Sequence, residues 1–333
     1  MGVMERDQHI RAFTRTIWRW FSCHRRDLPW RHLPVGDPLR RAYLVLVSEV
    51  MLQQTPVSRV QNVFRDFLVR FPSFEDLARA SNREVLLAWR GMGHNRRALQ
   101  LRDAAKDFPA NGEDLTRVPG IGAYTAAAIR TFAWNLETSC LDTNIRRVLH
   151  RTFFGPERFD GTWRVGDRTL LALAARVLEV ALVEGKRLVQ RGELSAPMGL
   201  AAEWHAALMD FGALVQTKKN PKWEECPLTR AGLCKAALVR GQKRHKRQKG
   251  RVRVRREPGR EVLGTFIPNR IFRGRIVEML RDAPSGLTLA LLGKKICPDW
   301  NRARHERWLR GLVAGLKRDH LLMQRGVRLA LSE

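Results

Sequence analysis

The fold is indicated by one stretch of sequence, Val118-Pro-Gly-Ile-Gly-Ala-Tyr-Thr125. Its two glycines permit a tight turn with positive φ between two helices, and such a turn leaves backbone N–H groups able to point at a phosphate. Contacts of that kind fix the register of a nucleic acid without reading its sequence. The stretch therefore predicts a hairpin between helices that binds phosphates through the following positions: Val118, Gly120, Gly122 and Thr125.

A carboxylate follows this turn by about one helix, in Leu141-Asp-Thr-Asn144, and a new helical stretch begins behind it at Ile145. Taken alone, the turn is only moderately specific, because similar hairpins occur in polymerases, ligases and non-catalytic DNA-binding modules. An Asp before a helix is otherwise most often an N-cap. Together, the turn and Asp142 favour a protein that grips a DNA backbone and holds an acid near the sugar.

The chain carries a large excess of positive charge. Its 333 residues include 61 Lys or Arg against 33 Asp or Glu, giving a formal net charge of +28 and a sequence pI near 11.3. The charge peaks between Arg240 and Arg256, where ten residues are basic and none is acidic. Tuning of solubility would scatter the charge, so nucleic acid is the expected partner and a small-metabolite specialist is not.

Neither a membrane span nor a secretory signal is expected. No run of about 18 apolar residues is free of charge, and the N-terminal residues have no apolar signal core behind them. The five cysteines are too few and too scattered for the disulfide framework of a secreted protein. We expect a monomeric intracellular protein, cytoplasmic and associated with the nucleoid, with no membrane partner.

Motifs upstream of the hairpin carry a resemblance to a known family. They are Leu28-Pro-Trp-Arg31, Ser48-Glu-Val-Met-Leu-Gln-Gln-Thr55 and the W-x-G-x-G pattern from Trp89 to Gly93. With the hairpin and L-D-x-N, these strings resemble, in order and separation, the MutY-type adenine DNA glycosylases of the endonuclease III superfamily. The resemblance spans residues 10 to about 235. It implies an all-α, helix-hairpin-helix glycosylase fold, in which two helical domains surround a DNA cleft.

The resemblance also implies roles in base removal. Breaking an N-glycosidic bond develops positive charge on the sugar and negative charge on the base, so the site needs an anion and an acid. By similarity, Glu49 protonates adenine and orients or activates water, and Asp142 stabilises the oxocarbenium-like sugar or traps it covalently. Tyr124 and Asn144 match positions that hydrogen-bond within the site. Glu49 has apolar neighbours, and desolvation would raise its pKa as a general acid requires.

Further positions match contacts with double-stranded DNA that holds a mismatch or an oxidised base. The target base must leave the stack before chemistry. Gln53 and Gln54 match residues that fill or probe the vacated position, and Trp30 and Arg31 match a region that lines the base pocket. Bifunctional relatives carry a Schiff-base lysine where Tyr124 stands, so the expected product is an abasic site without efficient strand cleavage.

Two departures concern how bases are read. His94-Asn95 stands where MutY-type enzymes generally have Tyr-Tyr and insert the first ring beside the oxidised guanine, and we expect His94 to contact DNA. Ala206 replaces a Glu or Gln that helps recognise adenine. The leading hypothesis is removal of adenine opposite 8-oxoguanine or guanine. The closest alternative is removal of thymine or uracil opposite guanine, and an alternative of another class is a non-catalytic DNA-structure-binding protein.

A third departure concerns metal. Many relatives hold a [4Fe–4S] cluster through C-x6-C-x2-C-x5-C, but here the first two positions are Gln216 and Trp223. Cys226 remains, and seven residues separate it from Cys234. Two thiols do not supply the four-cysteine set, and a zinc site would also lack two ligands. We therefore expect no cofactor, with Trp223 filling the space of a cluster ligand.

The sequence divides into four parts. Residues 1–30 and 145–235 correspond to the family's cluster domain, 31–144 form a helical domain with hairpin 118–125, 236–261 form a basic linker, and 262–333 form a winged-helix-like α+β unit. In the linker, Lys243, Arg244, Lys246 and Arg247 are expected to lie along phosphates, and the segment to be mobile without DNA.

The C-terminal unit differs from the 8-oxoguanine-reading domain of most relatives. Helices are predicted from Pro268, from Leu287 and around Arg302 to Arg318, and a closing hairpin is predicted to turn at Arg325-Gly326. The third helix is a candidate for DNA contact, with a packing appendage as the alternative.

Overall fold

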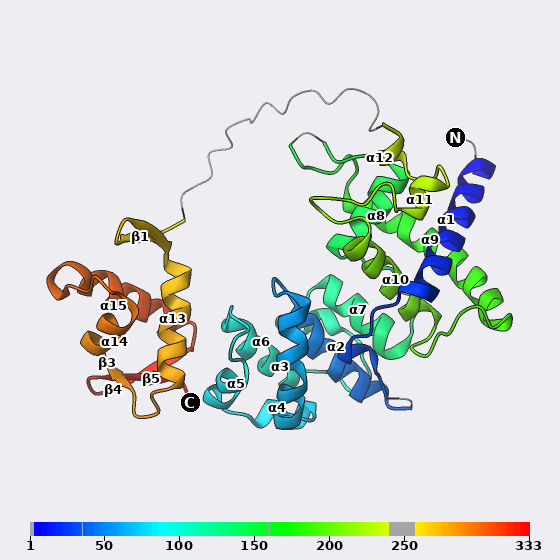
Figure 1. Cartoon of the computed structure of the whole chain (residues 1–333). Coiled ribbons are helices and arrows are strands. Elements are labelled where there is room, and N and C mark those ends of the chain that lie inside the picture. Colours follow the sequence, from blue (N-terminus) through cyan, green and yellow to red (C-terminus); the bar gives the residue numbers. More distant parts are fainter. Residues whose placement is uncertain (1–2, 35, 159, 240–256) are drawn as a thin grey trace. The chain divides into compact units, whose positions relative to one another are not determined.

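The computed structural model describes residues 3–34, 36–158, 160–239 and 257–333. These residues fold mainly as helices, joined near the C-terminus by short strands (Figure 1). They divide into two compact units, the first from residues 1–45 and 121–250 and the second from 46–120 and 251–333. Within the described ranges no helix is long and apolar enough to span a membrane. The basic stretch 240–256, with the four residues expected to contact phosphates, lies outside the described residues.

The first unit is helical. Its elements are α1 (Val3–His24), η1 (Pro29–Arg31), the start of α2 (Pro38–Leu52), α7 (Ala123–Trp134), α8 (Thr143–Phe153), α9 (Asp167–Gln190), α10 (Leu200–Leu214), α11 (Pro227–Arg230) and α12 (Lys235–Leu238). Ile10, Phe13, Ile17 and Phe21 lie on one face of α1, and all four are buried. Trp18 of the same face packs against Trp204 of α10, with ring centroids 5.2 Å apart.

α10 lies at the centre of this packing. It contacts α8, α1, α9 and α7, and most of its residues are buried because its sequence is apolar on nearly every side. A cap ties it to α7: Asn135 ends α7 in the left-handed conformation, and its side-chain oxygen accepts from the Ala201 amide at 3.1 Å. An alanine Cβ at Gly199 would lie 2.3 Å from the Asn135 side chain, so glycine is required there.

The second unit begins with shorter helices. They are the end of α2, α3 (Val57–Arg70), α4 (Phe74–Arg79), α5 (Asn82–Ala88), α6 (Arg96–Lys106) and η2 (Leu115–Arg117). Serines start two of them, as their sequences favour. Ser73 caps α4, and Ser81 forms a capping box with Glu84 at the start of α5. Trp89, Phe67 and Leu77 lie in the core that these helices enclose.

The C-terminal part of the second unit is a small α+β fold, as expected. Its elements are β1 (Gly259–Val262), β2 (Thr265–Pro268), α13 (Asn269–Arg281), β3 (Leu287–Thr288), α14 (Leu289–Ile296), α15 (Arg302–Arg318), β4 (Leu322–Arg325) and β5 (Arg328–Leu331). The last three strands form an antiparallel sheet in the order β3-β5-β4. α13, α14 and α15 pack against this three-stranded sheet.

Several local expectations need correction. The closing hairpin turns at Gly326-Val327, one residue later than predicted, because Arg325 pairs with Arg328 in the ladder. A first hairpin, β1 with β2, was not foreseen. On α15, Arg302 and Arg310 both form ion pairs with Glu306, so part of the helix's outward positive charge is neutralised within the helix itself.

Candidate active site

Asp142 is held at the first turn of α8. It is the N-cap of this helix, and its Oδ1 accepts from the Ile145 amide at 2.5 Å. Its other oxygen, Oδ2, accepts from the Asn144 side chain at 2.7 Å. Burial raises the pKa of Asp142, although these two donors and the charge of Arg147 oppose the shift. The site thus holds a desolvated carboxyl in a fixed orientation, which is characteristic of functional groups.

Arg147 holds Asn144, the side chain that donates to Asp142. Its Nη2 donates to Asn144 Oδ1 at 2.7 Å and to the Gly212 carbonyl, also at 2.7 Å. It is nearly fully buried, and a buried guanidinium keeps one geometry when its hydrogen bonds are satisfied. Asp142, Asn144 and Arg147 therefore form a short chain of contacts that ends on α10.

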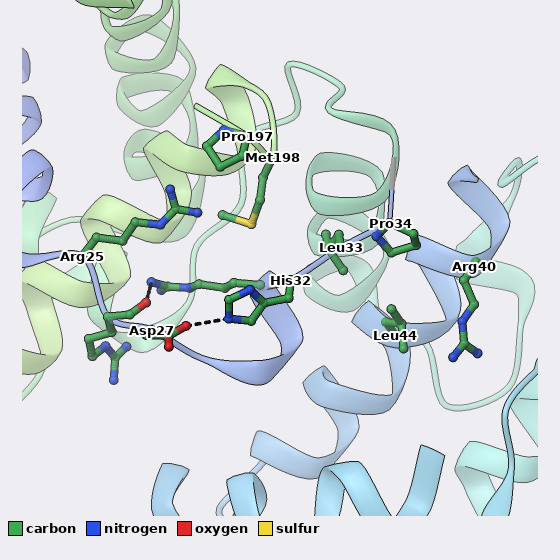
Figure 2. A pocket seen from close by; sticks show the side chains of 11 residues that line it. Arg25, Asp27, His32, Leu33, Pro34, Arg40, Leu44, Pro197 and Met198 are labelled. Atoms are coloured by element: carbon green, nitrogen blue, oxygen red, sulfur yellow. Dashed lines mark hydrogen bonds and ion pairs between the residues drawn. The ribbon is translucent and has the colours of Figure 1, made fainter. Parts of the chain in front are cut away.

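A pocket of about 760 Å³ opens in the same unit, shown in Figure 2. Its lining combines arginines with apolar side chains from the N-terminal segment and from residues 197 and 198. The residues that line it are Arg25, Arg26, Asp27, Arg31, His32, Leu33, Pro34, Arg40, Leu44, Pro197 and Met198. Arg31 of the expected base pocket is among them, and Trp30 lies next to it on η1, half-buried.

Three of the four arginines of this pocket are anchored by acids of α10. Arg31 forms a bidentate pair with Asp210, at 2.7 and 2.8 Å, and Arg26 reaches the same carboxylate at 2.7 Å. Arg25 pairs with Glu203 at 2.9 Å. Burial raises the pKa of Glu203, with Arg25 opposing the shift. Because Asp210 and Gly212 are two residues apart, α10 supports both the pocket and the Asp142 chain.

The hairpin has an open helix start. Gly120 adopts φ +88, but Gly122 does not need a positive φ: it is the extended N-cap of α7, with φ −82 and no side-chain cap. The expectation that both glycines turn with positive φ is therefore wrong for Gly122. Val118 and Thr125 are buried and fix the turn. The first amides of α7 have no intrahelical acceptor, as an anion-binding helix start requires.

Tyr124 is half-buried in the first turn of α7. Glu49 is half-buried on α2, with buried Ser48 and Val50 on either side. This placement agrees with the apolar surroundings read from the sequence.

The expected probing residues belong to the second unit and are exposed. Gln53 and Gln54 follow α2, and Gln54 has φ +54. His94 precedes α6 and has φ +44. Arg97 links these two loops, since its Nη1 contacts the Gln53 carbonyl and its Nη2 donates to Thr55 Oγ1 at 3.0 Å.

Comparison with known proteins identifies the family. Residues 47–161 match the HhH-GPD superfamily of base excision DNA repair proteins. The chain is 33% identical over 281 residues to an adenine DNA glycosylase of Mycolicibacterium smegmatis, with 82% of each chain covered. The chain belongs to the adenine DNA glycosylase family. This confirms the resemblance that the motifs indicated.

The chain is also similar to glycosylases that are named for thymine or uracil. A thymine/uracil-DNA glycosylase of Methanothermobacter thermautotrophicus is 28% identical over 229 residues, 66% of this chain and 91% of that protein. Among solved structures, a thermostable thymine-DNA glycosylase aligns with a TM-score of 0.54 at 26% identity, covering 70% of this chain and 98% of that one. The expected glycosylase fold is thereby confirmed.

The region where many family members hold a cluster contains an amide and two thiols. Gln216 is fully buried, and its Nε2 lies 3.6 Å from Cys234 Sγ and 3.9 Å from Cys226 Sγ. Its Oε1 has no hydrogen-bond partner within the described residues. Trp223 was expected to fill this space, but it packs over the Arg151 guanidinium, 5.5 Å from the ring centroid.

These residues do not fit a [4Fe–4S] cluster. Two thiols, Cys226 and Cys234, lie beside Gln216, whereas a [4Fe–4S] cluster is held by four cysteine thiolates. Among the described residues, no group of three or more His, Cys, Asp or Glu side chains is placed to hold a metal ion. Two arginines of α8 instead hold the segment, since Arg147 and Arg151 both donate to the Gln216 carbonyl.

Sequence reasoning missed the supporting residues of the site. Arg147 follows Asn144 by three residues, and this helical spacing on an apolar face was a usable signal. Gly212 and Asp210 carried no comparable signal, because their roles depend on how α10 packs against α8 and η1.

Proposed function

We propose that this member of the family is a monofunctional DNA glycosylase that hydrolyses the N-glycosidic bond of adenine mispaired with 8-oxoguanine or guanine. The observation that carries the proposal is Asp142, a desolvated carboxyl fixed by the Ile145 amide and by Asn144, in a chain of the adenine DNA glycosylase family. We further propose that it acts as a monomer on double-stranded DNA.

In the proposed reaction, the glycosidic bond breaks with its electron pair moving to the base. Glu49 supplies a proton to the departing adenine, which prevents full negative charge from building up on it. Asp142, ionised, stabilises the positive charge on the sugar from a site whose dipoles are already oriented. Water then adds to the sugar carbon and gives its proton to the Glu49 carboxylate, which leaves free adenine, an abasic site and the acid restored.

A thymine or uracil glycosylase remains the second candidate. Ala206 is fully buried on α10 and offers no side-chain group to adenine, and the thermostable thymine-DNA glycosylase has a similar fold. The non-catalytic reading is less favoured, because a DNA-binding module has no use for the fixed and desolvated Asp142.

A panel of duplexes separates these candidates. End-labelled duplexes with A·8-oxoguanine, A·G, T·G or U·G are incubated with the protein, and abasic sites are cleaved with alkali. We expect cleavage of the strand that held adenine. Cleavage confined to the T·G or U·G duplex would contradict the adenine assignment, and no cleavage of any duplex would support the binding protein.

The same panel without alkali tests the predicted product. With Tyr124 in place of a Schiff-base lysine, the strand should stay intact until alkali is added. Trapping with borohydride should give no covalent complex with DNA. A trapped complex at the rate of base removal would show lyase chemistry from another amine.

We also propose that the enzyme works without a [4Fe–4S] cluster. The buried Gln216 amide beside Cys226 and Cys234 supports this, because it occupies a ligand position without being a thiolate. Protein purified without oxygen should be colourless, and its visible spectrum should lack the absorption band of an iron–sulfur cluster at about 400 nm. Stoichiometric iron and sulfide in that preparation would refute the proposal.

A further inference from the structure

A buried arginine connects the C-terminal part of the second unit to a loop of its helical part. Arg281, the last residue of α13, has a side chain that is fully buried. Its Nε donates to the Leu86 carbonyl at 2.9 Å, and its Nη2 donates to Asn95 Oδ1, also at 2.9 Å. Nη1 pairs with Glu278 of the same helix. A buried guanidinium with three partners is held in one position.

Asn95 is diverted by this contact from its ordinary role. It is the N-cap residue of α6, where an asparagine side chain commonly accepts from the helix's own first amides. Here it makes no side-chain cap, and its oxygen accepts from Arg281 instead. The side chain is buried, with 8% of the residue exposed. The Asn95 side chain is therefore held by α13 and not by the first amides of α6.

The loop itself holds three residues with positive φ, one of which is not a glycine. Gly91, Gly93 and His94 have φ +81, +66 and +44, and a left-handed histidine persists only where its surroundings hold it. On one side Trp89 Nε1 donates to the Gly93 carbonyl at 3.0 Å. On the other side Arg281 holds Asn95. The exposed His94 is thus presented between two anchors, one from each part of the unit.

We infer that Arg281 is a positioning residue, through which the winged-helix-like fold sets the loop that probes the opposite base. The inference rests on the proposed function, because His94 occupies the place of a lesion-probing residue. The fold acts here by holding Asn95 and, through it, His94. Loss of the Arg281 to Asn95 contact should weaken recognition of a mismatch more than binding of DNA in general.

A first experiment follows the loop without DNA. Hydrogen exchange is measured in Arg281→Met, which keeps the length of the apolar stem but removes the guanidinium. The Arg97 amide, which donates to the His94 carbonyl at 2.9 Å, should exchange about tenfold faster, since a hydrogen bond to a charged group is lost. Amides of α3 should be unchanged. Equal exchange of the Arg97 amide in both proteins would overturn the inference.

A second experiment measures recognition. In full-length protein carrying Asp142→Asn to prevent turnover, Arg281→Met and Asn95→Ala should each reduce the ratio of mismatched to matched duplex affinity about tenfold. Matched affinity should change less than about twofold. Asn95→Asp keeps an acceptor for the guanidinium and should restore the ratio. The double variant Arg281→Met, Asn95→Ala should be no worse than either single variant, because both remove one contact.

A control at the same interface separates positioning from docking. Ser332→Ala removes a hydrogen bond to Asn82 (3.2 Å) that does not touch the loop, and should leave the ratio at the parental value. If Arg281→Met weakened both duplexes equally, or if Asn95→Asp behaved as Asn95→Ala, Arg281 would be merely structural. If the parent protein removed no base from any mismatch but the exchange result held, the proposed function would fail while the link to the loop would stand.

Discussion

Asp142 combines two roles that the sequence presented as alternatives. Its Oδ1 caps α8 and its Oδ2 accepts from Asn144, yet a carboxylate has about four acceptor positions, so capping leaves some for a substrate. The cap fixes the orientation of the group, and burial sets its pKa. The N-cap hydrogen bond therefore sets the direction in which this acid points.

Replacement of Asp142 by Asn tests its role in the chemistry. Asn is as good an N-cap as Asp, so the helix should form, but a neutral amide cannot stabilise a positive sugar. We expect single-turnover base removal to fall by about 100-fold or more, with matched-duplex affinity nearly unchanged. Asp167→Asn is the control. This exposed carboxylate lies at the start of α9 and pairs with Arg146 of α8, the helix that Asp142 caps. Full activity of Asp142→Asn would exclude Asp142.

The raised pKa of Asp142 predicts that the free energy of unfolding depends on pH, and the same substitution tests this. The folded pKa of Asp142 is raised by burial, so its contribution to stability is fully present below the unfolded pKa of about 3.9 and is lost as pH rises through the folded pKa. The amide of the Asp142→Asn variant does not titrate, and Glu203 titrates in both proteins. Urea unfolding from pH 8 toward pH 4 should therefore show the parent gaining stability relative to Asp142→Asn. A difference independent of pH would contradict the raised pKa.

At the residue scale, the sequence could predict groups that carry their own signal. Asp142 and Tyr124 stand in strings whose spacing is specific, and Gln216 stands at a place where cysteine was expected. Arg281 could not be predicted, because nothing local distinguishes it from other arginines of a chain with 61 Lys or Arg. Its partners, Leu86 and Asn95, are almost two hundred residues away in sequence.

At the element scale, α10 determines where α8 begins. The two helices pack closely at Gly212, where an alanine Cβ would lie 2.7 Å from Asn144 Cβ and 3.1 Å from its backbone. Backbone at that distance must shift to admit a methyl group. The position of Asp142 therefore depends on the absence of a side chain from α10.

Gly212→Ala should displace the start of α8. We expect a loss of stability of about 1–3 kcal/mol from overpacking and a fall in base removal of about tenfold or more at saturating enzyme, because small misplacements of catalytic groups are costly. Gly274→Ala is the matched control: this helical glycine of α13 has open space around it, and alanine there should stabilise by about 0.5–1 kcal/mol. Equal activity of both variants would show that α8 tolerates the shift.

Element prediction succeeded where one period repeats over many residues. The helix predicted around Arg302 to Arg318 is present as α15. Prediction failed for β1 and β2, which are four residues each and joined by Leu263-Gly264, because so short a pair has little alternation to detect. The one-residue error at Arg325 has another cause: the ladder, with Arg325 opposite Arg328, sets the turn.

At the scale of the whole molecule, charge governs association with DNA. The net charge of +28 predicts tight binding that weakens steeply with salt. Ten of the basic residues lie between Arg240 and Arg256, outside the described residues, so their role is a prediction from sequence.

The phosphate contacts expected of this stretch can be tested by replacing Lys243, Arg244, Lys246 and Arg247 with Ser. Each lost phosphate contact should reduce the slope of log K against log salt by about 0.9, or up to about 3.6 for all four. Matched and mismatched duplexes should weaken by similar factors, and single-turnover base removal at saturating enzyme should stay nearly unchanged. Loss of mismatch discrimination with an intact salt slope would instead assign lesion reading to this stretch.

The proposed absence of a cluster beside the buried Gln216 would have a consequence for the cell that carries this chain. In such an enzyme the segment around Gln216 is held by an amide, two thiols and two arginines. It would need no machinery for cluster assembly and would not compete for scarce iron. Oxidants that damage guanine also destroy exposed iron–sulfur centres. A clusterless glycosylase would therefore keep working through iron starvation and oxidative stress, when its substrate is most abundant.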